Sequence, residues 1–337
     1  MLPQVQSHQG KSLPMFSGGF FVFLLRRPLF VAFRQERLVY NRGMNRRTFI
    51  ETSVATAVLT SLSTKAFADE HKISKVGLQL YTVRDEMKKD FEGTIAKVAA
   101  IGYKEMEFAG YFGHSPEDVR TILDKNGLTS PSSHESYDTV EKKLPETLEG
   151  AHVIGQTFLV CPYIDEKMRT ADGYKRVAET FNKVGEASKK AGIQFAYHNH
   201  YWEFIPDAQL GGKFPYDFLL ESTDKNNVKM EMDLCWISVA GQDPVAYFKK
   251  YPGRFPLVHV KDMKKLPNVK PEQLASVNMK EVEKGLTSVG DGIIDWKRIF
   301  AAGSIGGIQH YFVENDAPKE AFSNIAASYK YLSQLTF

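Results

Sequence analysis

Short apolar runs alternate with longer amphipathic segments along the chain from residue 69 to its end. Short apolar runs predict buried strands, and a helical hydrophobic period predicts helices, so the alternation indicates βα units around a parallel sheet. We expect eight strands, at residues 76–81, 103–108, 128–133, 157–161, from 193 onward, and at 228–233, 255–260 and 308–313. We expect eight helices between and after them, at residues 90–101, 116–126, 140–154, 171–191, 215–221, 243–251, 295–302 and 318–335.

Eight such units predict a single-domain α/β fold, a closed (β/α)8 TIM barrel, over residues 69–337. That segment has 269 residues, which suits one barrel of about 250 residues. An open sheet that binds a nucleotide carries a glycine-rich loop after its first strand. Here the first strand runs into residues 82–85, which contain no glycine, so a nucleotide-binding fold is disfavoured.

The segment before residue 69 is predicted to be absent from the mature protein. Residues 45–50 read Asn-Arg-Arg-Thr-Phe-Ile, a twin-arginine pattern. An uncharged segment of moderate hydrophobicity follows at residues 52–64, and then Ala-Phe-Ala at 66–68. A charged start, a short apolar stretch and a small-residue cleavage site define a secretory signal. We therefore expect a twin-arginine signal peptide at residues 44–68 and a periplasmic or otherwise exported protein.

Residues 1–43 are then interpreted as an upstream over-extension without ordered structure, because a signal peptide should begin near its initiator, here Met44. The alternative is a membrane anchor at residues 20–25, an apolar run that Arg26 and Arg27 interrupt. The run at 52–64 is too short and too rich in Ser and Thr to span a bilayer. We expect no stable membrane anchor after processing.

Removal of the segment before residue 69 reverses the sign of the net charge. The whole chain carries a formal charge of +3, whereas residues 69–337 hold 34 basic and 38 acidic side chains, a net charge of −4. A mildly acidic domain without a basic run lacks the charge pattern of a nucleic-acid binder. We therefore expect no nucleic-acid partner.

Two cysteines, Cys161 and Cys235, lie in apolar strand-like runs. Exported proteins often form disulfides, but cysteines in such runs are usually buried. We expect two buried thiols rather than a disulfide.

Two histidines follow an apolar strand at the point where that strand ends. His198 and His200 come after Phe195 and Ala196, and side chains two positions apart on a strand share a face. Neutral imidazole is a common ligand for transition metals. The alternative is a surface turn that happens to hold polar residues.

The other predicted strands also end in ionisable residues. The carboxyl ends of barrel strands face one shared pocket. Two histidines with two carboxylates form a mixed nitrogen and oxygen site that suits one Mn²⁺, Zn²⁺, Co²⁺ or Fe²⁺ ion better than Mg²⁺. The candidate residues are Glu107, His134, His198, His200, Asp233, His259, Lys261 and Glu314.

Each candidate also has a structural interpretation. Glu107 could be a salt-bridge partner inside the barrel, His134 could line the rim, and Glu203 could be an exposed loop acid. Asp233 follows an otherwise apolar strand, and a carboxylate buried there needs a partner. Glu231 lies on the same face as Asp233 but deeper, where a structural role is an alternative.

The whole predicted mature chain, residues 69–337, resembles the xylose-isomerase-like TIM barrel superfamily of sugar phosphate isomerases and epimerases, in particular its exported branch with a twin-arginine leader. The matching motifs span the domain in order. They are Val76–Arg84, Gly102–Glu107, Ser133–His134, His198–Phe204, Asp233–Trp236, His259–Asp262, Val289–Trp296 and Glu314–Asn315.

The resemblance implies one divalent metal at the barrel mouth, held by residues that end strands five to eight. Carried onto this sequence, these ligands are His198, Asp233, His259 and Glu314. Members that epimerise ketoses carry a glutamate at the strand-five position, where it also transfers a proton. His198 stands at that position here, so the paired glutamates of simple ketose epimerisation are not preserved.

A metal at such a site acts as a Lewis acid and makes the carbon beside a carbonyl easier to deprotonate. The resulting enediolate would be held by the metal with Lys261 or His200. Glu314 is the first candidate base, and further candidates are Glu107, His134 and Glu203. Aromatic residues could form a stacking wall for sugar rings, namely Tyr81, Phe108, Trp202 and Trp236.

The leading hypothesis is a metal-dependent isomerase or epimerase of an unphosphorylated sugar or keto-sugar, because export and the lack of an arginine cluster argue against a phosphorylated substrate. The runner-up is a lyase or dehydratase of a keto-sugar or keto-glycoside at the same site. A third hypothesis is a non-catalytic exported sugar-binding barrel. The predicted partner is a small carbohydrate. A homo-oligomer is an alternative in which the lysine-rich excursion at residues 263–290 forms a subunit contact rather than a lid.

Overall fold

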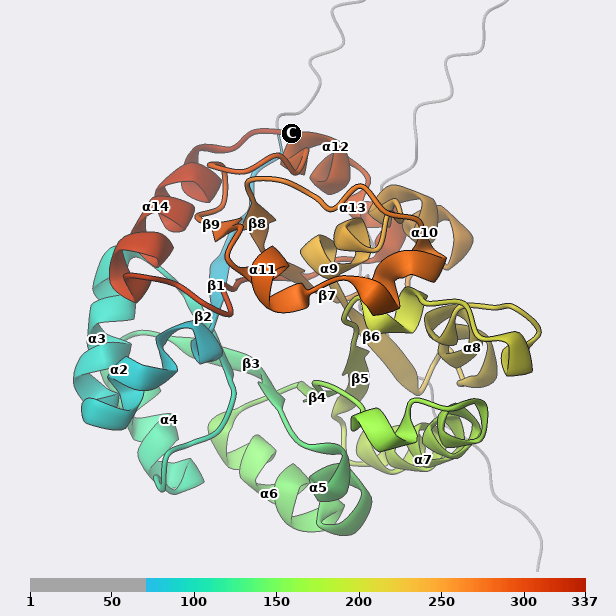
Figure 1. Ribbon diagram of the computed structural model, residues 1–337. Helices are drawn as coiled ribbons and strands as arrows, with labels where there is room; N and C mark the ends of the chain where they lie inside the picture. Colours follow the sequence, from blue (N-terminus) through green and yellow to red (C-terminus); the bar gives the residue numbers. More distant parts are fainter. Residues whose placement is uncertain (1–70) are drawn as a thin grey trace, which may run out of the picture. The chain divides into compact units, whose positions relative to one another are not determined.

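A computed structural model describes residues 71–337, so the predicted signal peptide and the segment before it lie outside the described residues. Eight parallel strands close a barrel in the order β1-β10-β7-β6-β5-β4-β3-β2 (Figure 1). This architecture confirms the predicted single-domain (β/α)8 barrel. The strands are β1 (Val76–Gln79), β2 (Glu105–Phe108), β3 (Thr129–His134), β4 (Phe158–Cys161), β5 (Gln194–His198), β6 (Val228–Asp233), β7 (Leu257–Val260) and β10 (His310–Val313).

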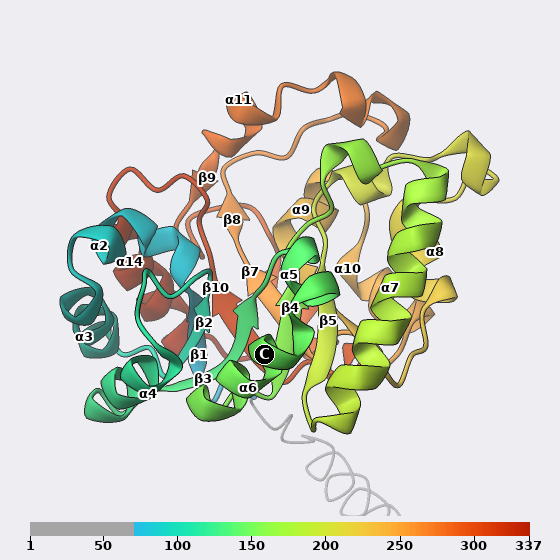
Figure 2. The same ribbon diagram turned by 90° about the horizontal axis from the view of Figure 1, so that it is seen from below.

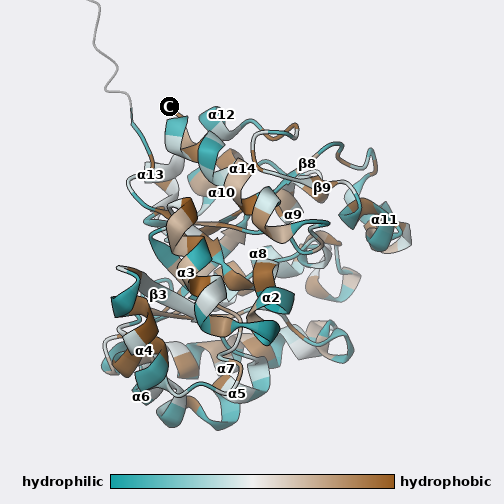
Figure 3. Ribbon diagram, turned by 90° about the vertical axis from the view of Figure 1, so that its left-hand side faces the viewer, coloured by the Kyte–Doolittle hydropathy of each residue, from teal (hydrophilic) through white to brown (hydrophobic). Residues whose placement is uncertain are grey.

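Helices surround the barrel and cover its outer face (Figure 1). They carry apolar and polar residues on different sides, so that brown and teal alternate along them in Figure 3. The longest, α7 (Ala171–Lys190), buries Val177, Phe181 and Val184 against the strands. The others are α2 (Arg84–Lys89), α3 (Phe91–Ile101), α4 (Pro116–Lys125), α5 (Tyr137–Lys142), α6 (Leu144–Ile154), α8 (Pro215–Ser222), α9 (Leu234–Val239), α10 (Pro244–Lys250), α11 (Met279–Glu283), α12 (Trp296–Ala301), α13 (Gly303–Gly306) and α14 (Ala321–Gln334).

The segment after β1 departs from the predicted strand at 76–81. The chain turns at Leu80 into a 3₁₀ helix, Leu80–Val83, because the Gln79 side chain accepts a hydrogen bond from the backbone N–H of Tyr81. The turn places Tyr81 at the rim instead of in the barrel wall.

The structure also corrects one predicted helix and adds one that was not predicted. The helix expected at 140–154 is two helices, α5 and α6, which meet at Lys143 just before Pro145. Proline has no backbone N–H, so it begins α6 rather than continuing α5. Helix α9 follows β6 directly and was not predicted, and the Asp233 carboxylate caps it by accepting from the backbone N–H groups of Cys235 and Trp236.

The predicted excursion leaves the barrel after β7 and returns before α12. It contains a short antiparallel pair, β8 (Asp262–Met263) with β9 (Leu286–Thr287), a 3₁₀ helix at Pro271–Ser276, and α11. In Figure 2 the excursion rises beyond the ends toward which the barrel strands point. It therefore stands on the same side of the molecule as the carboxyl ends of the strands.

The two ends of the described chain meet beneath the barrel. The backbone N–H of His71 donates to the carbonyl of Phe337, and the N–H of Phe337 donates to the carbonyl of His71, each at 3.0 Å. Cys161 and Cys235 are free and buried, which confirms the expectation of two thiols. Within residues 71–337, none of the helices is both long and apolar enough to cross a bilayer.

Candidate active site at the carboxyl end of the barrel

A cavity of about 350 Å³ opens at the carboxyl end of the barrel. Its volume falls within the range of pockets that hold small molecules. Charged residues from several strands and loops share it with two aromatic rings. Its lining includes Tyr81, His134, Tyr163, His198, His200, Glu314 and Asp316.

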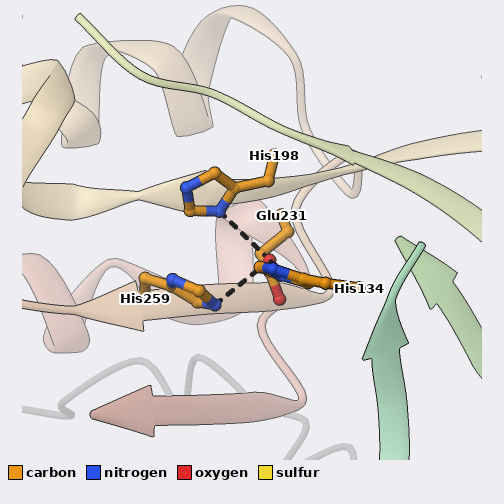
Figure 4. Close-up of side chains that lie close together, drawn as sticks. All are labelled: His134, His198, Glu231 and His259. Atoms are coloured by element: carbon orange, nitrogen blue, oxygen red, sulfur yellow. Dashed lines mark hydrogen bonds and ion pairs between the residues drawn. The ribbon is translucent and has the colours of Figure 1, made fainter. Parts of the chain in front are cut away.

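The Glu231 carboxylate lies at the centre of three imidazoles beneath this cavity (Figure 4). Its Oε2 atom is 2.8 Å from His134 Nε2, 3.1 Å from His198 Nδ1 and 3.1 Å from His259 Nε2. These residues come from β3, β5, β6 and β7, so closure of the barrel brings together groups far apart in the sequence. All of them except His134 are fully buried.

A second cluster, made of carboxylates, lies beside the cluster around Glu231 and shares His259 with it. His259 Nδ1 is 2.7 Å from Glu314 Oε2, whereas its Nε2 is 2.6 Å from Glu107 Oε2. The nearby Asp233 presents Oδ2, a buried oxygen that accepts no well-directed hydrogen bond. One atom each from Asp233, His259 and Glu314 lie within 4.8 Å of one another, a spacing that permits joint binding of a cation.

Lys261 places its ammonium group among three carboxylates. Nζ is 2.9 Å from Asp233 Oδ2, 2.8 Å from Glu314 Oε2 and 2.8 Å from Asp316 Oδ2. Burial opposes its charge, but these acids outweigh burial and hold the pKa of Lys261 well above its usual value. The side chain is therefore a fixed positive charge beside the cavity.

The histidines around Glu231 and Glu107 divide into protonated and neutral groups. Burial lowers the pKa of His134, but Glu107 and Glu231 outweigh that effect and raise it to about 9. The same carboxylates and Glu314 raise the pKa of His259 well above its usual value, again against burial.

The neutral histidines are His198 and His200. Burial, strengthened by neighbouring positive groups, lowers the pKa of both well below the usual range. His200 lines the cavity, and its buried Nδ1 has no hydrogen-bond partner among the described residues. A neutral imidazole with a free nitrogen can accept a proton or bind a ligand.

The predicted metal ligands fall into two groups that share His259. Asp233, His259 and Glu314 form one group, whereas His198 belongs to the group with His134, Glu231 and His259, and its Nε2 lies 3.8 Å from Asp233 Oδ2. Asp233 Oδ2 accepts no hydrogen bond from the described residues, and its charge is balanced by the Lys261 ammonium group at 2.9 Å. Mixed imidazole and carboxylate donors of this kind fit a divalent transition metal.

Glu107 hydrogen-bonds groups of the barrel interior, consistent with its predicted proximity to the site. It accepts from Gln79 Nε2 at 2.8 Å and from Ser132 Oγ at 2.6 Å. Burial raises its pKa, but His134 and His259 outweigh burial and hold the pKa well below its usual value. Glu107 is thus an anion that orients His259.

Glu203 does not line the cavity, and its position differs from that of an exposed loop acid. The residue is fully buried, where its carboxylate accepts from the Tyr197 hydroxyl and, at 2.8 Å, from the backbone N–H of His200. It positions the turn that carries His200.

The structure also assigns positions to residues that the sequence left open or missed. Glu231 belongs to the cluster rather than to the barrel wall alone, and its place two residues before Asp233 on one strand face was the signal for it. Asp316 had no such signal, because it follows β10 in a loop. Among the predicted aromatic residues, only Tyr81 is exposed at the mouth, whereas Phe108 and Trp236 are buried.

A family model described as xylose isomerase-like TIM barrel matches residues 95–313. The chain belongs to that family. It therefore shares the family's closed barrel, as the strand order already indicated.

Curated and solved relatives agree with this placement. Inosose dehydratase from Clostridium perfringens (strain 13 / Type A) is 27% identical over 234 residues, which cover 62% of this chain and 76% of the relative. A solved sugar phosphate isomerase/epimerase from Parabacteroides distasonis ATCC 8503 is 28% identical, with a TM-score of 0.62 over 80% of this chain and 97% of the other. The solved IolI protein with a bound zinc atom is 14% identical, with a TM-score of 0.58 over 76% and 95% of the two chains, a likeness that shows the fold alone. The first of these relatives is named as a dehydratase of inosose and the second as an isomerase or epimerase of sugar phosphates.

Proposed function

We propose that this protein is a metal-dependent lyase that removes a proton beside the carbonyl of a keto-sugar or keto-cyclitol and eliminates a hydroxyl group from the next carbon. One observation carries the choice of elimination: the fifth strand ends in His198, an imidazole hydrogen-bonded to Glu231, where two-base epimerisation needs a carboxylate. The similarity to inosose dehydratases supports the same choice.

His198, Asp233, His259 and Glu314 would hold the metal, and His259 would give up a ring proton as the ion binds. A divalent ion, with Mn²⁺, Zn²⁺ or Co²⁺ preferred over Mg²⁺ by this donor set, supplies Lewis acidity toward the carbonyl oxygen when it is bound. Glu231 and Glu107 accept hydrogen bonds from His198 Nδ1 and His259 Nε2, which would leave the other nitrogen of each imidazole to bind the ion.

In this proposal His200 accepts a proton from the substrate and His134 donates one to it. His200 is neutral and carries an unpartnered Nδ1 beside the cavity, so it suits the base that takes the proton from the carbon. His134 has a pKa of about 9 and is protonated near neutral pH, so it suits the acid that protonates the departing hydroxyl group. The products are an unsaturated ketone and water.

Lys261 and Glu314 have supporting roles. The Lys261 ammonium group stabilises negative charge that develops on the substrate oxygen. Burial raises the pKa of Glu314, but Lys261 and His259 outweigh burial and hold that pKa far below its usual value. Glu314 is thereby a good ligand and a weak base, which moves the role of first base from Glu314 to His200.

The test uses an inosose in D₂O with protein loaded with Mn²⁺ and with protein stripped by a chelator. The proposal expects a metal-dependent enone absorbance, which His200→Gln reduces by about 10²-fold or more. His310→Gln is the matched control, because His310 pairs with Glu105 at the opposite end of the barrel. A full rate in His200→Gln would refute the assigned base.

An isomerase or epimerase is the second candidate, because the Parabacteroides distasonis relative carries that name at 28% identity. It would show deuterium at the carbon beside the carbonyl and a new sugar, with no enone. Binding without exchange or product would instead favour a non-catalytic exported sugar-binding barrel.

A further inference from the structure

His200 differs from the other imidazoles of the site in how its ring is held. A carboxylate oxygen lies 2.8 Å from His134 Nε2, 3.1 Å from His198 Nδ1 and 2.6 Å from His259 Nε2. Among residues 71–337, no carboxylate approaches the His200 ring in this way, and its buried Nδ1 has no hydrogen-bond partner. Carboxylates therefore fix the ring planes of the other three histidines, but not that of His200.

The indole of Trp202 restrains the His200 ring by stacking on one of its faces. The two ring centroids are 4.1 Å apart, and the ring planes differ by 11°. His198 adds an edge contact, with its ring centroid at 5.0 Å and its plane at 77° to that of His200. A parallel neighbour at this distance resists tilting of the imidazole, because tilting would bring ring atoms into collision. Trp202 thus sets the plane of the His200 ring.

Arg169 covers the opposite face of the same indole. Its guanidinium carbon lies 3.6 Å from the Trp202 ring centroid, so the guanidinium and the His200 imidazole are both too close to the indole to share a face. A cation over an aromatic face is attracted by the electrons of the ring. Arg169 Nε donates to the carbonyl of Ile164 at 2.9 Å, which fixes the outer end of this stack.

The backbone of the turn that carries the stack is also held in place. Glu203 is fully buried and accepts from the backbone N–H of His200 at 2.8 Å and from the Tyr197 hydroxyl. Trp202 and Glu203 belong to the same 3₁₀ helix, Trp202–Phe204. One short turn therefore carries both the indole that stacks on the His200 ring and the carboxylate that binds the His200 backbone.

Trp202 and Arg169 lie outside the cavity in which we place the reaction. His200 lines that cavity of about 350 Å³, whereas Arg169 and Trp202 line a separate cavity of about 560 Å³ together with Tyr174 and Tyr201. Within the described chain, no residue lines both cavities. An influence of Arg169 on a substrate at His200 must therefore pass through Trp202.

We propose that Trp202 and Arg169 are positioning residues for His200, and that their stack sets the rate at which the imidazole takes a proton from the substrate carbon. This inference rests on the proposed function, because it takes His200 as the base. Proton removal from carbon requires the accepting nitrogen to be aligned with the C–H bond, and a misplacement of about 1 Å can lower a rate about 100-fold. The stack supplies the alignment that carboxylates give to the other histidines.

The first test measures kcat and KM for elimination from an inosose by the full, Mn²⁺-loaded protein. Trp202→Leu should lower kcat about 10- to 100-fold and change KM less than about twofold, whereas Trp202→Phe keeps a ring and should stay within about threefold of the parent kcat. Arg169→Ala should lower kcat about three- to tenfold, and Arg169→Lys, which keeps a cation, should recover part of that loss.

Two further measurements separate positioning from a general structural effect. With a substrate deuterated at the carbon that loses its proton, the isotope effect on kcat should be larger in Trp202→Leu than in the parent, because proton removal becomes slower relative to the other steps. In the His200→Gln protein, addition of Trp202→Leu should lower kcat less than about twofold further, since the residue through which Trp202 acts is gone.

Lys97 and Phe322 provide the matched control. The Lys97 ammonium group also lies 3.6 Å from an aromatic ring centroid, that of Phe322, in a contact between α3 and α14. Lys97→Ala and Phe322→Leu remove a contact of the same kind away from the site. Both variants should keep the parent values of kcat, KM and the isotope effect.

A measurement without substrate keeps this inference distinct from the proposed function. Stacking on an indole at 4.1 Å shifts the ring-proton signals of His200 upfield in the NMR spectrum of the full protein, and His200→Gln identifies these signals by removing them. Trp202→Leu should move them back toward the values of an unstacked imidazole. If these shifts occur but the parent protein eliminates nothing, the proposed function is wrong while the stack still orients His200.

The inference is overturned if Trp202→Leu leaves the His200 signals unchanged, or if it keeps the parent kcat and isotope effect in a protein that performs the elimination. Should Trp202→Leu not fold, Arg169→Ala decides the question, because Arg169 is half-buried beside a cavity and its removal leaves the indole in place. Parent values of kcat and parent His200 signals in Arg169→Ala would then overturn it.

Discussion

At the residue scale, the site depends on carboxylates that fix which nitrogen each imidazole presents. Glu231 accepts from His198 Nδ1 and also lies 2.8 Å from His134 Nε2. Burial raises the pKa of Glu231, and Glu107 adds to that effect. The imidazoles of His134 and His259 act in the opposite direction and stabilise the charged form of Glu231. The acid thus connects His134, the proposed general acid, with His198, a proposed metal ligand.

Glu231→Gln is expected to weaken metal binding about 10- to 100-fold, because an amide cannot hold the imidazole as firmly as a carboxylate. Competition between the protein and a chromogenic chelator measures this affinity. Glu105→Gln is the control, since Glu105 also pairs with a histidine, His310 at 2.8 Å, but at the opposite end of the barrel. That change should lower stability by about 1–3 kcal/mol and leave metal affinity unchanged. Equal effects of the two variants on metal binding would contradict the role of Glu231.

The two thiols provide a second test at this scale. Burial raises the pKa of Cys161 to about 12 and that of Cys235 well above its usual value. Because the thiolate is the reactive form, neither cysteine should react with a thiol reagent at pH 8 in the folded protein. Both should react at once in denaturant, as mass spectrometry would show. Rapid labelling of the folded chain would contradict the buried state.

Residue positions were predictable where a polar side chain ends an apolar strand. Asp233, His259 and Glu314 follow that rule, and the barrel brings them together. Glu203 could not be placed in this way, because a 3₁₀ turn at Trp202–Phe204 rotates its carboxylate inward to Tyr197. No strand or helix period describes such a turn.

At the element scale, one carboxylate organises the excursion between β7 and α12. Asp262 accepts from the backbone N–H groups of Gly290, Gly292 and Ile294 and from the Trp296 indole. The sequence indicated a lysine-rich excursion at residues 263–290, and in the structure this segment is a loop with two short helices, Pro271–Ser276 and α11. The β8–β9 pair could not be predicted, because each of its strands has only two residues.

Asp262→Ala would leave these donors without their acceptor and is expected to destabilise the excursion by about 1–3 kcal/mol or more. The excursion contains several exposed lysines, so trypsin should cut it faster in the variant than in the parent protein. Asp295→Ala is the control, because it removes only the cap of α12, at a cost of about 1 kcal/mol. If trypsin cuts both variants between residues 264 and 289 at the rate of the parent protein, Asp262 does not hold the excursion in place.

At the scale of the whole molecule, the fold could be predicted from the alternation of strands and helices without the exact bounds of any single element. Helix boundaries shifted or split, as at Lys143, yet the eight-strand order remained. The alternation of strands and helices specifies that order, because each parallel strand must be reached by a crossover. The first and last strands of the barrel, β1 and β10, pair in parallel and close it within the described residues.

Export remains a prediction about the whole chain, and it concerns residues outside the described structure. We propose that the twin-arginine pattern directs the protein across the membrane and that cleavage after Ala68 yields a chain beginning at Asp69. Replacing Arg46 and Arg47 with lysine should retain the full-length precursor inside the cell. The parent protein should appear in the periplasmic fraction with Asp69 at its N-terminus, as sequencing of the purified product would show.

Expression from Met44 instead of Met1 is the matched control, because the signal peptide predicted at residues 44–68 is then complete. It should give the same mature product in the same compartment. The exported chain should unfold at the same temperature as a chain expressed directly from residue 69, because the two would have the same sequence. Export that survives the lysine replacement, or a mature product that retains residues 44–68, would show that this segment is not a cleaved twin-arginine signal.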